Sequence, residues 1–283
     1  MKEESIIGID LGGTNLRVGE VKGEQIVKTS ATRINSSGTV EEVLQDIFML
    51  TDNMIHRSVK AIGVGVPSVV DLAQGIVYDV QYIPSWKEVP LKSLLQERYG
   101  IPVFVNNDAN CFALGELYFG KGKGRDSMIG LTIGTGLGSG IIIHKKLYAG
   151  VNCGAGEFGM VEYLDRCYEY YASGQFFQNV HGISGEAVFE RAQKGDAKAL
   201  KMYAEMGAHL GNAIKMVLYT YDTNLIVLGG SVRQAWPYFS KAMWAQIQTF
   251  AYGRSLKGLE IQVSELQNSG ILGAASLYFD AEQ

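Results

Sequence analysis

Residue types that can bind phosphate, metal ions and hydroxyl groups occur at separate points of this 283-residue sequence. The first point is a turn in which Asp10 is followed by Gly12, Gly13 and Thr14. Glycines leave main-chain N–H groups open to phosphate oxygens, and the Thr14 hydroxyl can add a contact. A carboxylate such as Asp10 can face a hydrated Mg²⁺ ion. We interpret this segment as a phosphate-binding turn; the alternative is that Asp10 only stabilises a hairpin.

A second glycine-rich turn runs from Gly134 through Thr135 and Gly136 to Gly140. It is not a P-loop, because no Gly-Lys-Ser/Thr closes it. It is not a dinucleotide fingerprint either, since the following residues 141–143 are all Ile and predict a strand where that motif must open a helix. Two such turns can be coincidence, because glycine is common in hairpins. We favour two turns that serve one ligand.

Asn107 and Asp108 follow a short apolar run and precede a predicted helix. One interpretation makes Asp108 the N-cap of that helix. The other makes it a carboxylate at the carboxyl end of a strand, where α/β folds bind ligands. There Asp108 could take a proton from a hydroxyl group while Asn107 bonds a neighbouring one. The spacing alone leaves both interpretations open.

Strands and helices must position these residues, and their pattern alternates along the chain. Apolar runs predict strands at residues 6–10, 15–21, 26–34, 61–66, 103–106, 128–133, 140–144, 225–228 and 261–263. Helices are predicted after the capping box of Thr39 and Glu42, from Pro90 to Gly100, and at residues 172–180, 185–194, 196–219 and 235–250, besides helices starting near 109 and 270. Because strand, glycine turn and strand occur twice, we expect a duplicated α/β architecture with a cleft between the halves.

Composition restricts the possible partners. Hydrophobic residues make up 47% of the chain and charged residues 19%, so a large core is possible. The formal net charge is −4. Basic residues gather only at 121–125, which argues against nucleic acid or a membrane surface as a partner. We expect a cytoplasmic protein, since no signal peptide or membrane span is evident and the cysteines Cys111, Cys153 and Cys167 are too few for a disulfide framework.

Four segments resemble, in order, those of the ROK family of sugar kinases, which includes bacterial glucokinases, fructokinases, N-acetylmannosamine kinases and β-glucoside kinases. They are residues 10–15, 107–110, 134–140 and the Gly-Ala-Gly-Glu-Phe-Gly segment at 154–159. The resemblance extends from residue 6 to the segment at 270–275. It implies an actin-like (ribonuclease H-like) ATPase fold with two α/β domains flanking a cleft. We expect residues 1–118 plus 270–283 in a small domain and 119–269 in a larger one.

The resemblance also implies roles for individual residues. Asp108 is similar to the catalytic base, and Asp10 to the acid that faces Mg-ATP. The residues similar to phosphate contacts are Gly12, Gly13, Thr14, Thr135 and Gly136, and those similar to the adenosine-side turn are Gly229 and Gly230. The residues similar to sugar-binding ones are Asn107, Glu157, Pro67 and Ser68, although the family commonly has Gly where Ser68 stands.

One segment departs from the family pattern. Most members follow the Gly-Glu-x-Gly segment with a His that touches the sugar and then a three-Cys zinc knuckle. Here Met160 stands in the place of that His, and only Cys167 remains, so we expect no structural zinc. The segment resembles the shortened loop of β-glucoside kinase-like members. Glu169 is then either the second sugar carboxylate or a solvated loop acid.

We therefore expect ATP- and Mg²⁺-dependent phosphorylation of a hexose or hexose derivative, in a homodimer. The alternatives are a β-glucoside or N-acetylhexosamine kinase and a sugar-binding regulatory protein without kinase activity. Family repressors carry an N-terminal winged helix, for which we expect no room because the Asp10 motif begins near Met1. Neither the sugar nor its reacting hydroxyl follows from the sequence.

Overall fold

The computed structural model describes residues 4–282, and they form two compact units. Unit 1 contains the described residues up to Asp126, the segment Gly140–Ala155 and the described residues from Glu265 on. Unit 2 contains Ser127–Ser139 and Gly156–Ser264. The expected domain limits, 1–118 plus 270–283 and 119–269, stay a prediction. No helix among residues 4–282 is long and apolar enough to cross a membrane.

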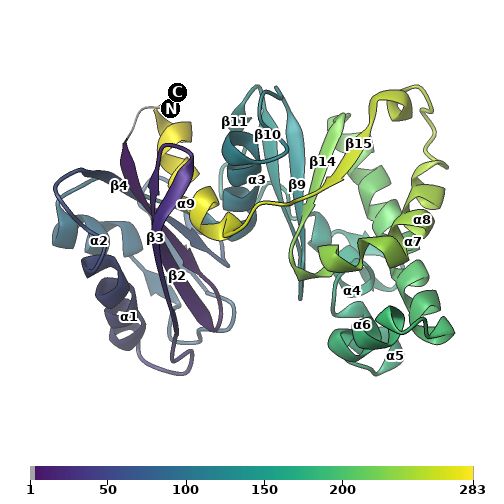
Figure 1. The fold of residues 1–283 in the computed structure, drawn as a ribbon, viewed down its shortest axis with the longest axis horizontal. Coiled ribbons are helices and arrows are strands. Elements are labelled where there is room, and N and C mark those ends of the chain that lie inside the picture. The colour runs from purple at the N-terminus through teal and green to yellow at the C-terminus, as the bar shows by residue number, and fades with distance from the viewer. Residues whose placement is uncertain (1–3, 283) are drawn as a thin grey trace. The chain divides into compact units, whose positions relative to one another are not determined.

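Unit 1 is built on a sheet with the strand order β3-β2-β1-β4-β8. Its strands are β1 (Ser5–Leu11), β2 (Asn15–Lys22), β3 (Gln25–Arg33), β4 (Val59–Val66) and β8 (Val103–Asn107). The first three pair antiparallel, as the predicted hairpin requires, whereas β1, β4 and β8 run parallel. The carboxyl ends of β1, β4 and β8 therefore lie at one edge of the sheet, of which Figure 1 labels the strands β2, β3 and β4.

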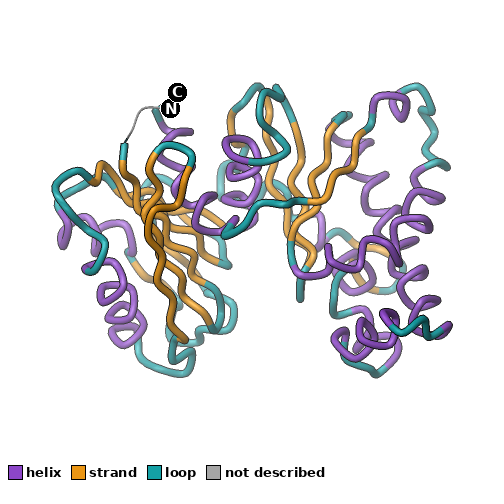
Figure 2. The backbone as a smooth tube through the Cα atoms, viewed as in Figure 1, coloured by secondary structure: helices purple, strands orange, loops and turns teal. Residues whose placement is uncertain are grey.

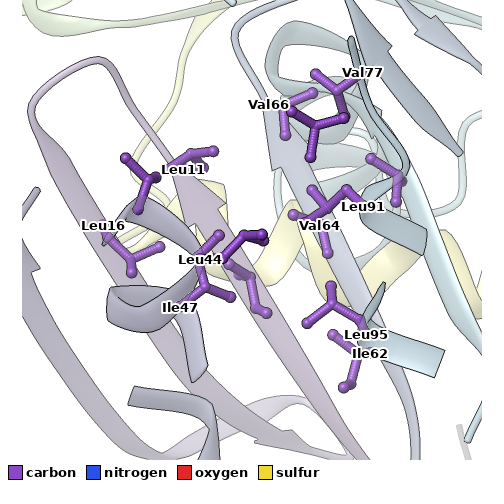
Figure 3. Packing of buried hydrophobic residues seen from close by; sticks show 14 of the residues in the cluster. Leu11, Leu16, Leu44, Ile47, Ile62, Val64, Val66, Val77, Leu91 and Leu95 are labelled. Carbon is purple, nitrogen blue, oxygen red and sulfur yellow. The ribbon is translucent and has the colours of Figure 1, made fainter. Parts of the chain in front are cut away.

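Helices cover both faces of this sheet. On one face, α1 (Val40–Asp52) and α2 (Leu91–Tyr99) bury an apolar cluster to which Leu44, Val64 and Leu91 contribute (Figure 3). On the other face, α9 (Ser269–Ala281) packs on β1 and β4 and beside α3 (Asp108–Phe119). The helix comes this close because Gly8 and Gly63 have no side chain: a Cβ on Gly63 would lie 1.8 Å from the carbonyl oxygen of Ala274.

A small antiparallel sheet in unit 1 is absent from the sequence prediction. It consists of β5 (Val70–Asp71), β6 (Ile76–Tyr78) and β7 (Glu88–Val89), in that order. Val77, Ile83 and Trp86 anchor this region in the core of α1 and α2. The chain between β6 and β7 is thus held firmly, although it contains two residues, Asp79 and Tyr82, with left-handed backbone.

Unit 2 places the parallel strands β9 (Met128–Ile133), β14 (Leu225–Gly229) and β15 (Glu260–Val263) side by side in that order. Its helices are α4 (Tyr168–Ala172), α5 (Phe176–His181), α6 (Gly185–Gln193), α7 (Ala197–Tyr221) and α8 (Trp236–Ile247), drawn in purple in Figure 2. A short hairpin joins β12 (Glu162–Tyr163) to β13 (Arg166–Cys167), and 3₁₀ turns lie at Phe158–Met160, Ser231–Ala235 and Ser255–Gly258.

Two predicted boundaries were wrong. β10 (Leu137–Ile143) starts in unit 2 and ends in unit 1, where it pairs with β11 (Lys146–Leu147), so the glycine turn occupies only residues 134–136. Gly140 belongs to the strand, where a Cβ would lie 2.7 Å from the carbonyl oxygen of Ala109 in α3. The helix predicted at 172–180 is two helices, α4 and α5, because Ser173 and Gly174 bond to the glycine turn instead.

Candidate functional site

Asp10 lies near the carboxyl end of β1, opposite Arg17 of β2. The Arg17 Nη1 atom is 3.7 Å from Oδ2 of Asp10, a long contact for an ion pair across the hairpin. The carboxylate also lies against the first turn of α9: a Cβ on Gly270 would be 2.3 Å from Oδ2. Burial raises the pKa of Asp10, and Arg17 opposes the rise. A cation would favour the charged form, so Asp10 fits a ligand of hydrated Mg²⁺, which can be bound through one carboxylate.

The turn after Asp10 is closed by its own backbone and by an aromatic residue. The N–H of Gly12 donates to the carbonyl oxygen of Asn15 at 2.8 Å, and the Thr14 side chain is exposed. Tyr82 packs on Gly13, where a Cβ would lie 2.8 Å from the Cβ of the tyrosine. Tyr82 is 55% exposed and has a φ of 69°. Sequence reasoning missed this residue, because 69 positions separate it from the turn that it touches.

Asn107, and not Asp108, caps α3. Its Oδ1 accepts from the N–H of Ala109 at 2.9 Å and of Asn110 at 3.3 Å. The interpretation of Asp108 as the N-cap was therefore wrong. Asp108 is the first residue of the helix and is exposed, with Oδ1 2.8 Å from the N–H of Ala109. Asp108 is therefore not the N-cap, although its Oδ1 accepts from one N–H of the first turn of α3.

The Pro67–Ser68 loop after β4 contacts the end of β8. The Nδ2 of Asn107 donates to the carbonyl oxygen of Ser68 at 3.3 Å, and the Ser68 hydroxyl donates to the carbonyl oxygen of Tyr78. Pro67 and Ser68 are half-buried. Because β1, β4 and β8 end at the same edge of the sheet, unit 1 brings Asp10, Ser68 and Asp108 to that edge, which is where α/β sheets bind ligands.

In unit 2 the second turn is held by the segment between α4 and α5. The Ser173 hydroxyl donates to the carbonyl oxygen of Thr135 at 2.9 Å, and the N–H of Gly174 donates to that of Gly134 at 2.7 Å. The Thr135 side chain is exposed. The turn thus has a fixed backbone and one exposed hydroxyl, as a phosphate contact requires.

Glu169 is bonded to the same turn. Its Oε2 accepts from the N–H of Leu137 at 2.9 Å, and a Cβ on Gly136 would lie 2.5 Å from that oxygen. Glu157 precedes the 3₁₀ turn Phe158–Met160 and stays exposed to solvent. Atoms packed around its carboxyl raise its pKa, and the charge of Glu169 raises it further. Glu169 is therefore more than a solvated loop acid, while its contact with a sugar stays a prediction.

A pocket of about 650 Å³ opens beside this turn in unit 2. Its volume is in the range of small-molecule sites. Apolar and polar residues share its lining, among them Thr135, Phe177, Phe189, Tyr203, Ser231 and Ala235. Gly229 ends β14, and Gly230 has a φ of 78° with space for no side chain, since a Cβ would lie 2.2 Å from the carbonyl oxygen of Ile133.

The segment in which we expect no zinc knuckle forms the hairpin of β12 and β13 and carries an aromatic cluster. Tyr163 stacks on Tyr168 with ring centroids 4.3 Å apart, and its hydroxyl is 3.1 Å from Nδ1 of His209. Met160 is 63% exposed. Residues 4–282 contain no group of three or more His, Cys, Asp or Glu side chains that could hold a metal ion. The absence of zinc stays a prediction.

Residues 6–281 match the ROK family. A glucokinase of Thermotoga maritima is 27% identical over 98% of both chains, and the xylose repressor of Bacillus subtilis is 29% identical over 84% of this chain and 68% of the repressor. A ROK family glucokinase from Streptomyces griseus, solved with glucose and AMPPNP, is 28% identical, with a TM-score of 0.81 over 96% of this chain and 98% of that chain. A putative sugar kinase from Cytophaga hutchinsonii is 27% identical, with a TM-score of 0.85 over 97% and 99%. The chain therefore belongs to the ROK family and has its actin-like ATPase fold.

Proposed function

We propose that this protein is a sugar kinase that transfers the γ-phosphoryl group of ATP to a hydroxyl of a hexose or hexose derivative. The family and the relatives named glucokinase support this proposal. The observation that carries it is the position of Asp108, a carboxylate at the ligand-binding edge of the sheet that is not the helix cap. A carboxylate there can act as the general base that takes the proton of the attacking hydroxyl.

The sugar-binding role of unit 1 rests on Asn107 and its neighbours. An amide NH₂ group carries two hydrogens. One hydrogen of Asn107 Nδ2 donates to Ser68, and we assign the other to a sugar oxygen next to the reacting hydroxyl. Because Oδ1 of Asn107 caps α3, the side chain cannot rotate without loss of the cap. Pro67 and Ser68 complete this side of the sugar site.

Each unit carries residues that we assign to nucleotide binding. Gly12, Gly13 and Thr14 of unit 1 and Thr135 and Gly136 of unit 2 bind phosphate oxygens, while Asp10 holds Mg²⁺ through water. When bound, Mg²⁺ neutralises charge on the transferred group. The pocket in unit 2, with Gly229 and Gly230 beside it in the sequence, suits adenosine because aromatic side chains line it together with hydroxyl groups.

Glu157 is the sugar ligand that we assign to unit 2. A carboxylate accepts hydrogen bonds from two neighbouring hydroxyls. Glu169 stays a predicted sugar ligand as well, and its bond to Leu137 supports a second role in shaping the turn at Gly136. Met160 offers the sugar only an adaptable apolar surface with a weak acceptor. We therefore propose a wider sugar range than that of a strict glucokinase, including β-glucosides or N-acetylhexosamines.

A second candidate function is sugar binding without catalysis. The likeness to the xylose repressor of Bacillus subtilis supports it, since the identity of 29% is close to the 27% of the Thermotoga maritima glucokinase, although it extends over 84% and not 98% of this chain. The two functions differ in one measurable respect, because only a kinase consumes ATP when sugar is added.

The test is ATP consumption with glucose, mannose, fructose, N-acetylated hexosamines and cellobiose, each with and without Mg²⁺. We expect at least one sugar to stimulate ATP consumption, and Mg²⁺ omission to abolish it. Sugar binding by calorimetry without any ATP consumption would instead support the regulatory function. Glucose ahead of every other sugar by several orders of magnitude would contradict the wide sugar range. Light scattering tests the homodimer that we propose in addition.

A further inference from the structure

A buried polar cluster lies behind the residues that hold Asp108. The side-chain oxygen of Asn106, in β8, accepts from the Nδ2 of Asn110 at 2.9 Å and from the thiol of Cys153 at 3.4 Å. The same oxygen accepts from the backbone N–H of Asn107 at 2.8 Å. All three side chains are nearly inaccessible, with exposed fractions of 7% for Asn106, 1% for Asn110 and 2% for Cys153. The cluster therefore joins the end of β8, the first turn of α3 and the loop at residue 153.

Cys153 occupies a backbone conformation that favours glycine. Its φ is 57°, in the left-handed region where a side chain other than that of Gly, Asn or Asp is uncommon. The loop around it is closed, since the N–H of Ala155 donates to the carbonyl oxygen of Ala149 at 3.2 Å. A glycine would satisfy the backbone at this position but would supply no donor to Asn106. Cys153 therefore has a strained backbone, but it supplies the hydrogen bond to Asn106 that a glycine could not make.

Asn110 depends on this cluster for its orientation. Its Nδ2 donates to Asn106 and lies 3.8 Å from the sulfur of Cys153, whereas its buried Oδ1 finds no partner within residues 4–282. Because this oxygen is unused, the side-chain hydrogen bonds that orient the buried amide are those of its NH₂ group. The Oδ1 of Asn110 makes no hydrogen bond within residues 4–282 that could replace those of Nδ2. The backbone N–H of Asn110 is one of the two that donate to Oδ1 of Asn107.

We propose that the Cys153 thiol is a positioning group for the proposed reaction: by donating to Asn106 it fixes the end of β8 and the start of α3, and thereby Asn107 and Asp108. This inference rests on the proposed kinase function. It adds to that function a residue that touches neither substrate nor nucleotide. Glu157 follows four residues later in the chain, so the loop that supplies the thiol also leads into the segment of a predicted sugar ligand.

Three substitutions of Cys153 separate its thiol from its backbone. Cys153→Ala removes the donor and keeps a Cβ, and we expect kcat for the sugar to fall about three- to tenfold, the range of one lost hydrogen bond. The KM for ATP should stay unchanged. Cys153→Ser restores a donor and should recover most of the loss. Cys153→Gly relieves the left-handed strain and removes the thiol, so we expect it to be at least as stable as wild type yet as slow as Cys153→Ala.

Asp222→Gly is the matched control. Asp222 follows α7 with a φ of 44°, so this change relieves the same kind of backbone strain away from the cluster, and kcat should not change. Loss of activity in parallel with thermal stability across the Cys153 variants would reduce the thiol to a packing role and overturn the inference. Wild-type kcat in Cys153→Ala and Cys153→Gly would overturn it as well.

A second measurement does not depend on activity. Hydrogen exchange of the backbone amides at residues 107–110 should be faster in Cys153→Ala and Cys153→Gly than in wild type, and normal in Cys153→Ser. If wild-type protein phosphorylates no sugar, the proposed function fails, and this exchange pattern still decides whether the thiol fixes the start of α3. Equal exchange in all variants would contradict the inference.

Discussion

The two glycine turns, one after Asp10 in unit 1 and one at residues 134–136 in unit 2, are supported in different ways. Tyr82 packs on Gly13 with its Cβ and ring, and that Cβ cannot move without its loop. Glu169 instead reaches the second turn with a carboxylate, which accepts the N–H of Leu137 and could rotate away. The neighbour beside Gly13 is therefore a packed Cβ and ring, whereas the neighbour beside Gly136 is a carboxylate that accepts one hydrogen bond. The two turns should respond differently to the same substitution.

Gly13→Ala should have the larger effect of the two. The added methyl group would lie 2.8 Å from Tyr82 Cβ, so the turn or the tyrosine loop must move. Overpacking of this kind costs about 1–3 kcal/mol, which corresponds to a fall of about 5- to 150-fold in ATP binding if the strain falls on the turn. Calorimetry with AMPPNP measures it.

A second substitution checks the cause. Tyr82→Gly in the Gly13→Ala background removes the clashing Cβ and suits the left-handed backbone of residue 82, so binding should recover. Tyr82→Ala keeps that Cβ and should recover less. Equal recovery by both would show that the ring, and not the Cβ, is the obstacle.

Gly136→Ala should weaken ATP binding less. The new methyl group would displace the Glu169 carboxylate from Leu137, which costs one hydrogen bond, about 1 kcal/mol or a fivefold rise in KM for ATP. Gly134→Ala is the control for folding, because the nearest atom to its Cβ would be 3.9 Å away. A larger loss in Gly136→Ala than in Gly13→Ala would reverse the comparison between the turns.

Glu169→Gln should lower the pKa of Glu157 and leave the hydrogen bond to Leu137 in place. Gln can still accept from Leu137, but it removes the charge that helps to raise the pKa of Glu157. The pKa of Glu157 is higher in the folded than in the unfolded state, so protonation of Glu157 stabilises the fold. This stabilisation is fully present below the usual Glu pKa of about 4.3 and is lost as the pH rises through the raised pKa of the folded state. In Glu169→Gln the loss should be smaller. Carboxyl NMR titration measures the pKa of Glu157. An unchanged pKa in Glu169→Gln would show that the charge of Glu169 does not act on Glu157.

Metal removal should have no effect on folding. The aromatic cluster around Tyr163 lies in the segment where the resemblance implies a zinc knuckle that this sequence lacks, so a chelator should leave the thermal midpoint unchanged. Metal analysis of protein purified without added metal gives an independent result. One equivalent of tightly bound zinc would contradict our interpretation of the shortened loop.

Local signals in the sequence predicted most elements correctly. The capping box of Thr39 and Glu42 starts α1, and α2 ends at Gly100 in the left-handed conformation, both as predicted. One of the two interpretations of Asp108 put the N-cap of α3 one residue too late, because Asn and Asp cap helices equally well. The strands β5, β6 and β7 were missed because two or three residues are too few to show a periodic pattern.

The supports of the candidate site could not be predicted from the sequence. Tyr82 and Gly13, Glu169 and Leu137, and Cys153 and Asn106 are pairs separated by dozens of residues, and no periodicity or motif connects their members. The residues proposed for chemistry were found because their types and the turns around them are local. The residues that position them come from the tertiary fold.

The turnover of Asp108→Asn tests the central claim most directly. Because Asn107 caps α3, this change should leave folding and the binding of sugar and AMPPNP near normal. Removal of the general base should lower kcat by about two to four orders of magnitude with the best sugar of the panel. Turnover within a few-fold of wild type, in a variant that still binds both ligands, would contradict the assignment of Asp108 as the base.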